Sequence, residues 1–174
     1  MRTEDLWWGY KAREDGMILA PNGDILNQHM YGKYYGVLLR NPETAINKQI
    51  HVHRLMARAF IHNPRPDVFT LIDHIDRNER NNDWDNLRWL NNSLNLLNRD
   101  TKGAYFNTRW KKWEARVRNK PLGWFKTYQE AHRCSKKHKR DLFYREYTQL
   151  CEDGIPLNLW NYSSETSDRY PSRY

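Results

Sequence analysis

The stretch that decides the fold covers residues 71–99 and reads LIDHIDRNERNNDWDNLRWLNNSLNLLNR. A short apolar run leads into Asp73-His74, and a polar, asparagine-rich loop over 76–86 follows. A second strand-like run covers 87–90, and the leucines over 93–99 recur at helical spacing. We therefore expect two short strands joined by a loop and then a helix, with Asn95 on the helix.

Three side chains of this stretch have the chemistry that phosphodiester hydrolysis needs. The attacking water needs a base, and His74 supplies an imidazole, the side chain most often used for that role. The leaving oxygen develops negative charge, which a hard divalent cation stabilises. Such a cation takes carboxylate and amide oxygens, which Asp73 and Asn95 offer if the strands and the helix bring them together.

The same stretch resembles the HNH nucleases, specifically the branch of phage and intron-encoded homing endonucleases. The matching residues are Val52-His53-Arg54-Leu55, Ala59-Phe60, Asp73-His74-Ile75-Asp76, Asn78, Asn81-Asn82, Asn86-Leu87-Arg88-Trp89 and Asn95. The resemblance implies a ββα-metal finger, in which a hairpin and a helix surround one divalent cation, Mg²⁺ or Mn²⁺. It also implies products with a 3′-hydroxyl and a 5′-phosphate.

The resemblance gives each site residue a role. Asp73 and Asn95 would bind the metal, His74 would be the general base, and Asn86 would orient and polarise His74. The family has glycine after the second aspartate, where this chain has Arg77. Either Arg77 takes the left-handed conformation that glycine adopts freely, or the turn differs. We count Arg77 among the expected DNA contacts.

The residues before this stretch predict a β-rich region and a helix. Over 15–50, short apolar runs alternate with turn signals such as Asn22-Gly23, and a last strand is expected near 49–52. From His53 the apolar period becomes helical, and the helix should end before Asn63-Pro64. His53 falls on the same helix face as Phe60 in this pattern. We therefore expect the His53 side chain to pack in the interior or to make a buried hydrogen bond, and not to take part in catalysis.

The positive charge of the chain is confined to one segment. The net charge is +8, yet residues 101–140 hold thirteen Lys or Arg and two Asp or Glu, a net +11. Aromatic residues are interleaved with these bases, which a disordered tail would not carry. A folded basic module that binds a polyanion is therefore the better interpretation.

Local patterns predict how the basic module folds. The run 113–118 alternates, with Ala115 and Val117 on one face and Arg116 and Arg118 on the other. Thr127, with Glu130 three residues later, predicts a capping box at the start of a helix that runs to about residue 139. A separate helix is expected over 141–151, and the tail from residue 163 is left unassigned.

The basic module is similar to the DNA-binding domain of plant ethylene-response factors, the APETALA-two type. The matching residues are Gly103, Tyr105, Trp113, Ala115, Arg116, Leu122-Gly123, Phe125, Glu130 and Ala131. The resemblance implies a three-stranded antiparallel sheet on one helix, with the open sheet face in the DNA major groove. The DNA contacts expected from the alternation and its neighbourhood are Arg116, Arg118, Arg109, Lys111 and Lys120.

Composition excludes several other classes. No run approaches the roughly 20 apolar residues that span a bilayer, and the first residues lack the apolar core of a signal peptide. Cys134 and Cys151 have no partner motif, so we expect neither a disulfide scaffold nor structural zinc. We therefore expect the protein to work in a reducing compartment, which is the cytoplasm of the cell, or of the host cell if a phage encodes the chain.

Together these patterns predict an α+β chain of four parts. Residues 1–50 form a β-rich region, 51–100 the HNH nuclease domain, 101–140 the basic DNA-binding module, and 141–174 a helix and tail. The expected function is site-preferring, metal-dependent cleavage of double-stranded DNA. The protein is expected to act as a monomer and not to associate with a membrane. Two alternatives remain open: a DNA-binding regulator with a decayed nuclease finger, and a less specific nuclease.

Overall fold

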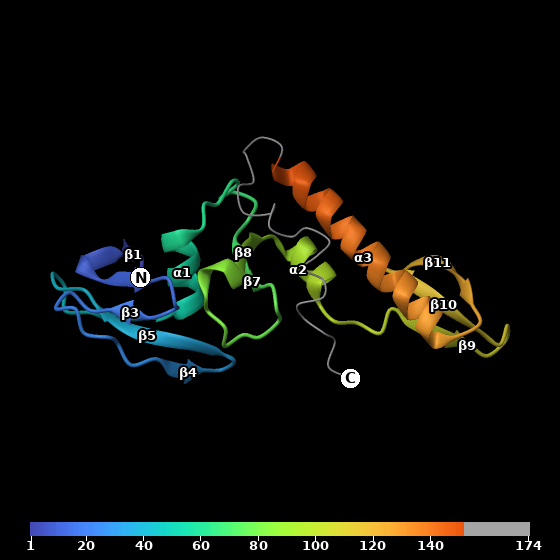
Figure 1. Cartoon of the computed structure of the whole chain (residues 1–174), viewed down its shortest axis with the longest axis horizontal. Coiled ribbons are helices and arrows are strands. Elements are labelled where there is room, and N and C mark those ends of the chain that lie inside the picture. Colours follow the sequence, from blue (N-terminus) through green and yellow to red (C-terminus); the bar gives the residue numbers. More distant parts are fainter. Residues whose placement is uncertain (152–174) are drawn as a thin grey trace. The chain divides into compact units, whose positions relative to one another are not determined.

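The structure, a computed structural model, describes residues 1–151. These residues divide into two compact units, one over Met1–Leu90 and another that begins at Asn91 (Figure 1). The boundaries predicted at residues 50 and 100 do not coincide with this division. The expected tail from residue 163 lies outside the described residues. No helix within residues 1–151 combines the length and the apolar character that crossing a membrane requires.

The first unit is built from three small antiparallel sheets and one helix. Its elements are β1 (Thr3–Asp5), β2 (Lys11–Arg13), β3 (Ile18–Leu19), β4 (His29–Tyr31), β5 (Tyr34–Arg40), β6 (Asn47–His51), α1 (Val52–Phe60), β7 (Leu71–His74) and β8 (Leu87–Leu90). The sheet orders are β1-β2-β3, β4-β5-β6 and β7-β8. Short 3₁₀ turns cover Trp7–Gly9 and Trp84–Asn86.

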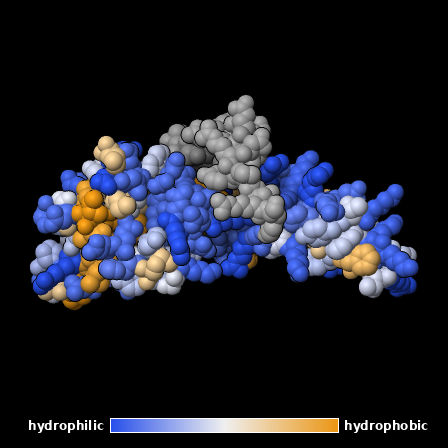
Figure 2. Space-filling view, turned by 60° about the horizontal axis from the view of Figure 1, so that its bottom comes forward, coloured by the Kyte–Doolittle hydropathy of each residue, from blue (hydrophilic) through white to orange (hydrophobic). Residues whose placement is uncertain are grey.

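The elements predicted in this unit are largely present. The helix after residue 51 and the strand over 87–90 are confirmed. The first hairpin strand, predicted over 68–72 and ahead of Asp73-His74, instead covers Leu71–His74 and includes that pair. The Asn22-Gly23 turn is present, but only one bridge, between Leu19 and Ile25, follows it instead of a second strand. In the view of Figure 2, most of the surface is hydrophilic, and apolar side chains gather over the first unit.

One hydrophobic core holds the first unit together. Helix α1 contacts β2, β5, β6 and β8 and buries its apolar face between them. The buried members of this core are Tyr10, Ala12, Ile18, Val37, Leu39, Val52, Leu55, Met56, Phe60 and Leu87. They come from both the predicted β-rich region and the predicted nuclease segment. The two regions therefore share one hydrophobic core.

The second unit is a sheet covered by a long helix. Its elements are α2 (Asn92–Asn98), β9 (Ala104–Asn107), β10 (Lys112–Val117), β11 (Lys120–Phe125) and α3 (Tyr128–Cys151). The strands are antiparallel in the order β11-β10-β9, as expected. Ala104, Ala115 and Ala131 form the buried contact between the sheet and α3.

Helix α3 begins as predicted and does not stop where it was expected to stop. The capping box is confirmed, since Thr127 Oγ1 accepts from Glu130 N and Glu130 Oε2 accepts from Thr127 N, both at 3.2 Å. The predicted break near residue 140 is wrong. The helix is continuous because its buried face repeats every four residues through Phe143, Tyr147 and Cys151, with no glycine or proline between them.

Candidate functional site

The Asp73-His74 pair ends strand β7. In the hairpin, Asp73 pairs with Arg88 of β8 and His74 pairs with Leu87. The buried apolar side chains of Leu87 and Leu90 anchor the second strand. The pair therefore sits on regular hairpin backbone at the point where the loop over 76–86 begins.

Arg88 holds the Asp73 carboxylate. Its Nε and Nη2 donate to Asp73 Oδ2 at 2.9 and 2.8 Å, and the two side chains are only 13% and 11% exposed. The guanidinium supplies the positive charge that a nearly buried carboxylate needs. Arg88 is not among the predicted site residues, although its position across the hairpin from Asp73 is a signal for this pair.

The His74 ring is buried and is held on several sides. Its Nε2 lies 3.3 Å from Asn82 Oδ1. The ring stacks on Tyr34 with centroids 6.0 Å apart, and meets the edge of His53 at 5.4 Å. An oxygen acceptor at one ring nitrogen fixes the tautomer and leaves the other nitrogen able to take a proton.

Asn86 holds the loop and does not contact the His74 ring. Its Oδ1 accepts from Asp76 N at 3.0 Å, and its Nδ2 donates to Asp76 Oδ1 and to Asn81 O, both at 2.9 Å. Asn86 lies before β8, so its side chain turns into the loop. The expected contact with His74 is therefore corrected to Asn82. The backbone still links Asn86 to this site, because Asn86 O accepts from Ile75 N at 2.8 Å.

Arg77 adopts the conformation that the family glycine would adopt. Its φ is +61°, and its N donates to His74 O at 3.0 Å to close the turn. Of the two alternatives, the structure therefore shows a left-handed residue at Arg77. A side chain with a Cβ carries a steric cost there that glycine does not carry.

Three histidines and one tyrosine form a ring cluster in the first unit, which we call the histidine cluster: Tyr34, His51, His53 and His74. His51 and His53 stack at 5.5 Å with an angle of 10°, and Tyr34 lies 4.7 Å from His53. The Nδ1 atoms of His51 and His53 are buried without a hydrogen-bond partner. The packing role expected of His53 is confirmed.

Electrostatics keep the centre of the histidine cluster neutral. Burial first, and then charge on His74, His51 and Arg54, lower the pKa of His53 from its ordinary 6.5 to about 3. The cluster is not arranged as a metal site, because stacked rings do not aim their nitrogens at one point. Within residues 1–151, no group of three or more His, Cys, Asp or Glu is arranged to hold a metal.

Asn95, the second predicted metal ligand, lies half-buried on α2 in the second unit. The helix is capped by Asn91, whose Oδ1 accepts from Leu94 N at 2.9 Å. Asp73 belongs to the first unit, so the shared metal site of Asp73 and Asn95 stays a prediction. The carboxylate and the amide suit a hard divalent cation by their chemistry.

The predicted DNA contacts of the basic module divide into two groups. Ala115 and Val117 are buried and Arg116 is exposed, as the alternation predicts. Arg116 donates to Glu114 Oε2 at 2.6 Å. Arg118 is a correction: it follows the end of β10 with φ +49° and bonds Glu146 and Ser93, so it is not on the open sheet face.

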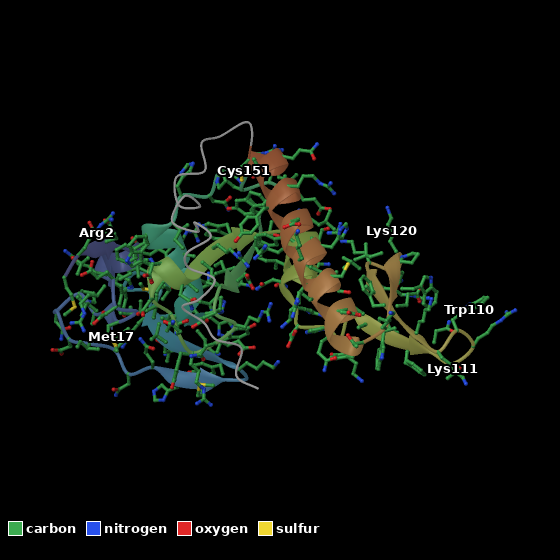
Figure 3. The ribbon with its side chains drawn as sticks, turned by 45° about the vertical axis from the view of Figure 1, so that its right-hand side comes forward. Arg2, Met17, Trp110, Lys111, Lys120 and Cys151 are labelled. Atoms are coloured by element: carbon green, nitrogen blue, oxygen red, sulfur yellow. The ribbon has the colours of Figure 1, made fainter. Side chains whose placement is uncertain are left out.

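The remaining predicted contacts lie on the strand connections. Arg109 and Lys111 are exposed in the turn between β9 and β10, and Lys120 opens β11. Figure 3 shows Lys111, Lys120 and the neighbouring Trp110 extending outward from these connections. The Arg109 guanidinium lies 5.4 Å from the centre of the Trp110 ring. These cations are exposed at the connections between the strands.

Comparison with known proteins supports a relationship to the HNH endonucleases. No protein-family model matches the chain. The chain is 35% identical over 99 residues to an HNH endonuclease of Acanthamoeba polyphaga mimivirus, covering 56% of this chain and 29% of that protein. A second HNH endonuclease of the same virus is 33% identical over 88 residues, covering 50% and 22%. The chain thus spans less than a third of the length of these curated relatives.

A solved structure gives the same indication. The chain is similar to the HNH homing endonuclease I-HmuI, in a structure described as DNA binding and cleavage by that enzyme. The TM-score is 0.50 and the identity 26%, over 56% of this chain and 57% of that chain. These likenesses bear out the resemblance of the chain to the HNH endonucleases. The APETALA-two resemblance of the second unit stays a prediction.

Proposed function

We propose that the chain is a metal-dependent, site-preferring DNA endonuclease. The observation that carries the proposal is the Asp73-His74 pair at the end of β7, on a hairpin that pairs Asp73 with Arg88. The similarity to HNH endonucleases supports this assignment. Hydrolysis of a phosphodiester bond is the reaction, and duplex DNA is the substrate.

His74 acts as the general base in this proposal. Asn82 fixes one ring nitrogen, and the stacked Tyr34 ring and the edge of His53 restrict how the imidazole can turn. A base that is already oriented loses little freedom when it takes a proton from the attacking water. Asn86 acts one step further away, by holding the loop that follows His74.

Asp73 and Asn95 are the proposed ligands of one Mg²⁺ or Mn²⁺. When bound, this cation would stabilise the charge on the leaving oxygen. Asp73 supplies a carboxylate whose position Arg88 already restricts. Arg88 can remain as a second positive group beside the scissile phosphate.

The second unit supplies most of the DNA affinity. Residues 101–140 carry a net charge of +11. By contrast, residues 1–50 and residues 51–100 each carry equal numbers of acidic and basic side chains, so neither segment has a net charge. Lys111, Lys120 and Arg109 are exposed on the strand connections and suit phosphate contacts. The logarithm of the affinity should fall with the logarithm of the salt concentration, with a slope that is steeper by about 0.9 for each contacted phosphate.

Cleavage of a supercoiled plasmid and of the DNA that flanks the gene tests this proposal. We expect nicked or linear product with Mg²⁺ or Mn²⁺ and none in excess chelator. His74→Ala should lower the rate by a factor of about 10² to 10⁴ while DNA binding survives. Asp73→Ala should abolish cleavage, and Asn95→Asp should retain part of it because an oxygen ligand remains.

The matched control is His62→Ala, which removes an exposed histidine outside the histidine cluster. Wild-type cleavage by His74→Ala would remove His74 from the role of base. Full cleavage in chelator would refute the metal dependence. DNA binding without any cleavage would favour the non-enzymatic regulator, and equal cutting of random DNA would favour the less specific nuclease.

A further inference from the structure

The two faces of the β9–β11 sheet differ in what covers them. Helix α3 covers one face, where Ala104 and Ala115 meet Ala131. Trp113 points to this side and meets the Tyr128 ring edge-on, with centroids 5.1 Å apart. The opposite face, defined by side chains that alternate with these, is the open face of the sheet.

A row of three residues crosses the open face. Glu114 on the central strand pairs with Tyr105 of β9 on one side and with Trp124 of β11 on the other. Cross-strand neighbours have Cβ atoms roughly 5 Å apart, so the two aromatic residues stand about 10 Å apart with the carboxylate between them. Tyr105 and Trp124 are 50% and 45% exposed, although both sit on regular strands.

The carboxylate in this row is neutralised. Glu114 is only 6% exposed, and its Oε2 accepts from the Arg116 guanidinium at 2.6 Å. Arg116 is therefore paired within the sheet, and Glu114 occupies its Nε and Nη2 donors. The chemistry that the centre of this face presents to solvent is aromatic, next to a guanidinium plane.

The surroundings of the row attract a polyanion. The row lies in the segment with net charge +11, and the exposed Lys112 follows the β9–β10 turn on the same strand as Glu114. A basic surface with exposed rings at its centre matches how proteins hold single-stranded nucleic acid: cations track the phosphates and rings stack on bases. In an intact duplex the base faces are covered by neighbouring bases, so only unpaired bases can stack on a protein ring.

We propose that the open face of the β9–β11 sheet binds unpaired nucleobases by stacking them on Tyr105 and Trp124. The ligand is single-stranded or locally opened DNA. This assigns the face a different ligand from the major groove expected from the sequence, because Arg116 is paired and Arg118 lies elsewhere. The inference rests on the proposed function only in taking DNA as the nucleic acid.

Three DNA probes separate stacking from phosphate contacts. The full-length protein is titrated with a labelled thymidine oligonucleotide, with an abasic oligonucleotide of the same length, and with a duplex of that length, all in chelator. We expect the thymidine strand to bind more tightly than the abasic strand. Tyr105→Ala and Trp124→Ala should each weaken thymidine binding about fivefold to a hundredfold, and leave abasic and duplex binding within about twofold.

Matched variants control for folding and for location. Tyr105→Phe and Trp124→Phe keep a ring and should restore most of the affinity. Trp110→Ala removes a still more exposed ring from the β9–β10 turn, outside the row, and should have little effect. Thermal unfolding of every variant identifies any that lose the fold. If an Ala variant is unfolded, the corresponding Phe variant tests whether a ring at that position is needed for binding.

Each outcome supports or overturns the proposal. Equal binding of thymidine and abasic strands, or equal losses for duplex and single strand, would overturn stacking on unpaired bases. An equal loss with Trp110→Ala would overturn the assignment to this row. Plasmid cleavage is measured separately, so ring-dependent binding without cleavage would refute only the proposed nuclease function, and cleavage without ring dependence only this inference.

Discussion

The substitution His53→Phe should make the free energy of unfolding less sensitive to acid. Burial holds the pKa of His53 near 3 in the folded protein, against an ordinary 6.5. Below about pH 6.5 the unfolded chain binds a proton at this residue while the folded chain does not, so stability falls as the pH falls, until about pH 3. Phenylalanine keeps a ring against Tyr34 and His74 and binds no proton.

The magnitude follows from the width of that window. Each unit of pKa difference corresponds to about 1.4 kcal/mol, so lowering the pH from about 7 to about 5 should cost the wild type roughly 2 kcal/mol through His53. The variant should lack this part of the loss. The measurement is the free energy of unfolding by urea at both pH values, for the wild type and the variant.

The control for this experiment is His62→Phe, which removes an exposed histidine. Its loss of stability between the two pH values should match that of the wild type. The same loss in His53→Phe as in the wild type would refute the reasoning, since it would mean that folded His53 accepts a proton as easily as the unfolded chain does.

Three further changes test the loop and the two units. Arg77→Gly should raise the free energy of unfolding by up to about 1 kcal/mol, because it relieves φ +61°; thermal unfolding would show this, and a lower melting temperature would contradict it. Asn86→Ala should cost about 2 kcal/mol, because it leaves Asp76 N and Asn81 O without their partner; urea unfolding measures this, and an unchanged midpoint would deny Asn86 its role in the loop. Trp113→Ala should destabilise the second unit by about 3 kcal/mol through lost packing on Tyr128; faster hydrogen exchange confined to α3 and its sheet is the expected result, and unchanged exchange is the contrary one.

Local signals in the sequence predicted the elements that carry the site. The helical period after residue 51, the two runs around the loop and the Thr127–Glu130 box each depend on residues close in sequence, and all are present. The alternation in β10 placed Ala115 and Arg116 correctly. These features need no knowledge of what packs against them.

Contacts between distant residues were not predictable in the same way. Asn82 meets His74 across eight residues of loop, and its type does not distinguish it from the other asparagines there. Arg118 continues the alternation by sequence, but the strand ends one residue earlier and the backbone turns left-handed. Strand register, strand ends and loop closure depend on contacts throughout the fold. A local pattern of apolar residues carries no information about those contacts.

The hydrophobic core around α1 limits how the nuclease motif could be transplanted. Val52, Leu55 and Met56 of α1 are completely buried, and much of what covers them is contributed by strands that precede residue 51. A chimera that carried only 51–99 onto another DNA-binding scaffold would expose this apolar stripe to water and would aggregate or unfold. The smallest transferable cassette for the Asp73-His74 hairpin therefore includes the segments before residue 51 that supply this core, among them β2, β3 and β5.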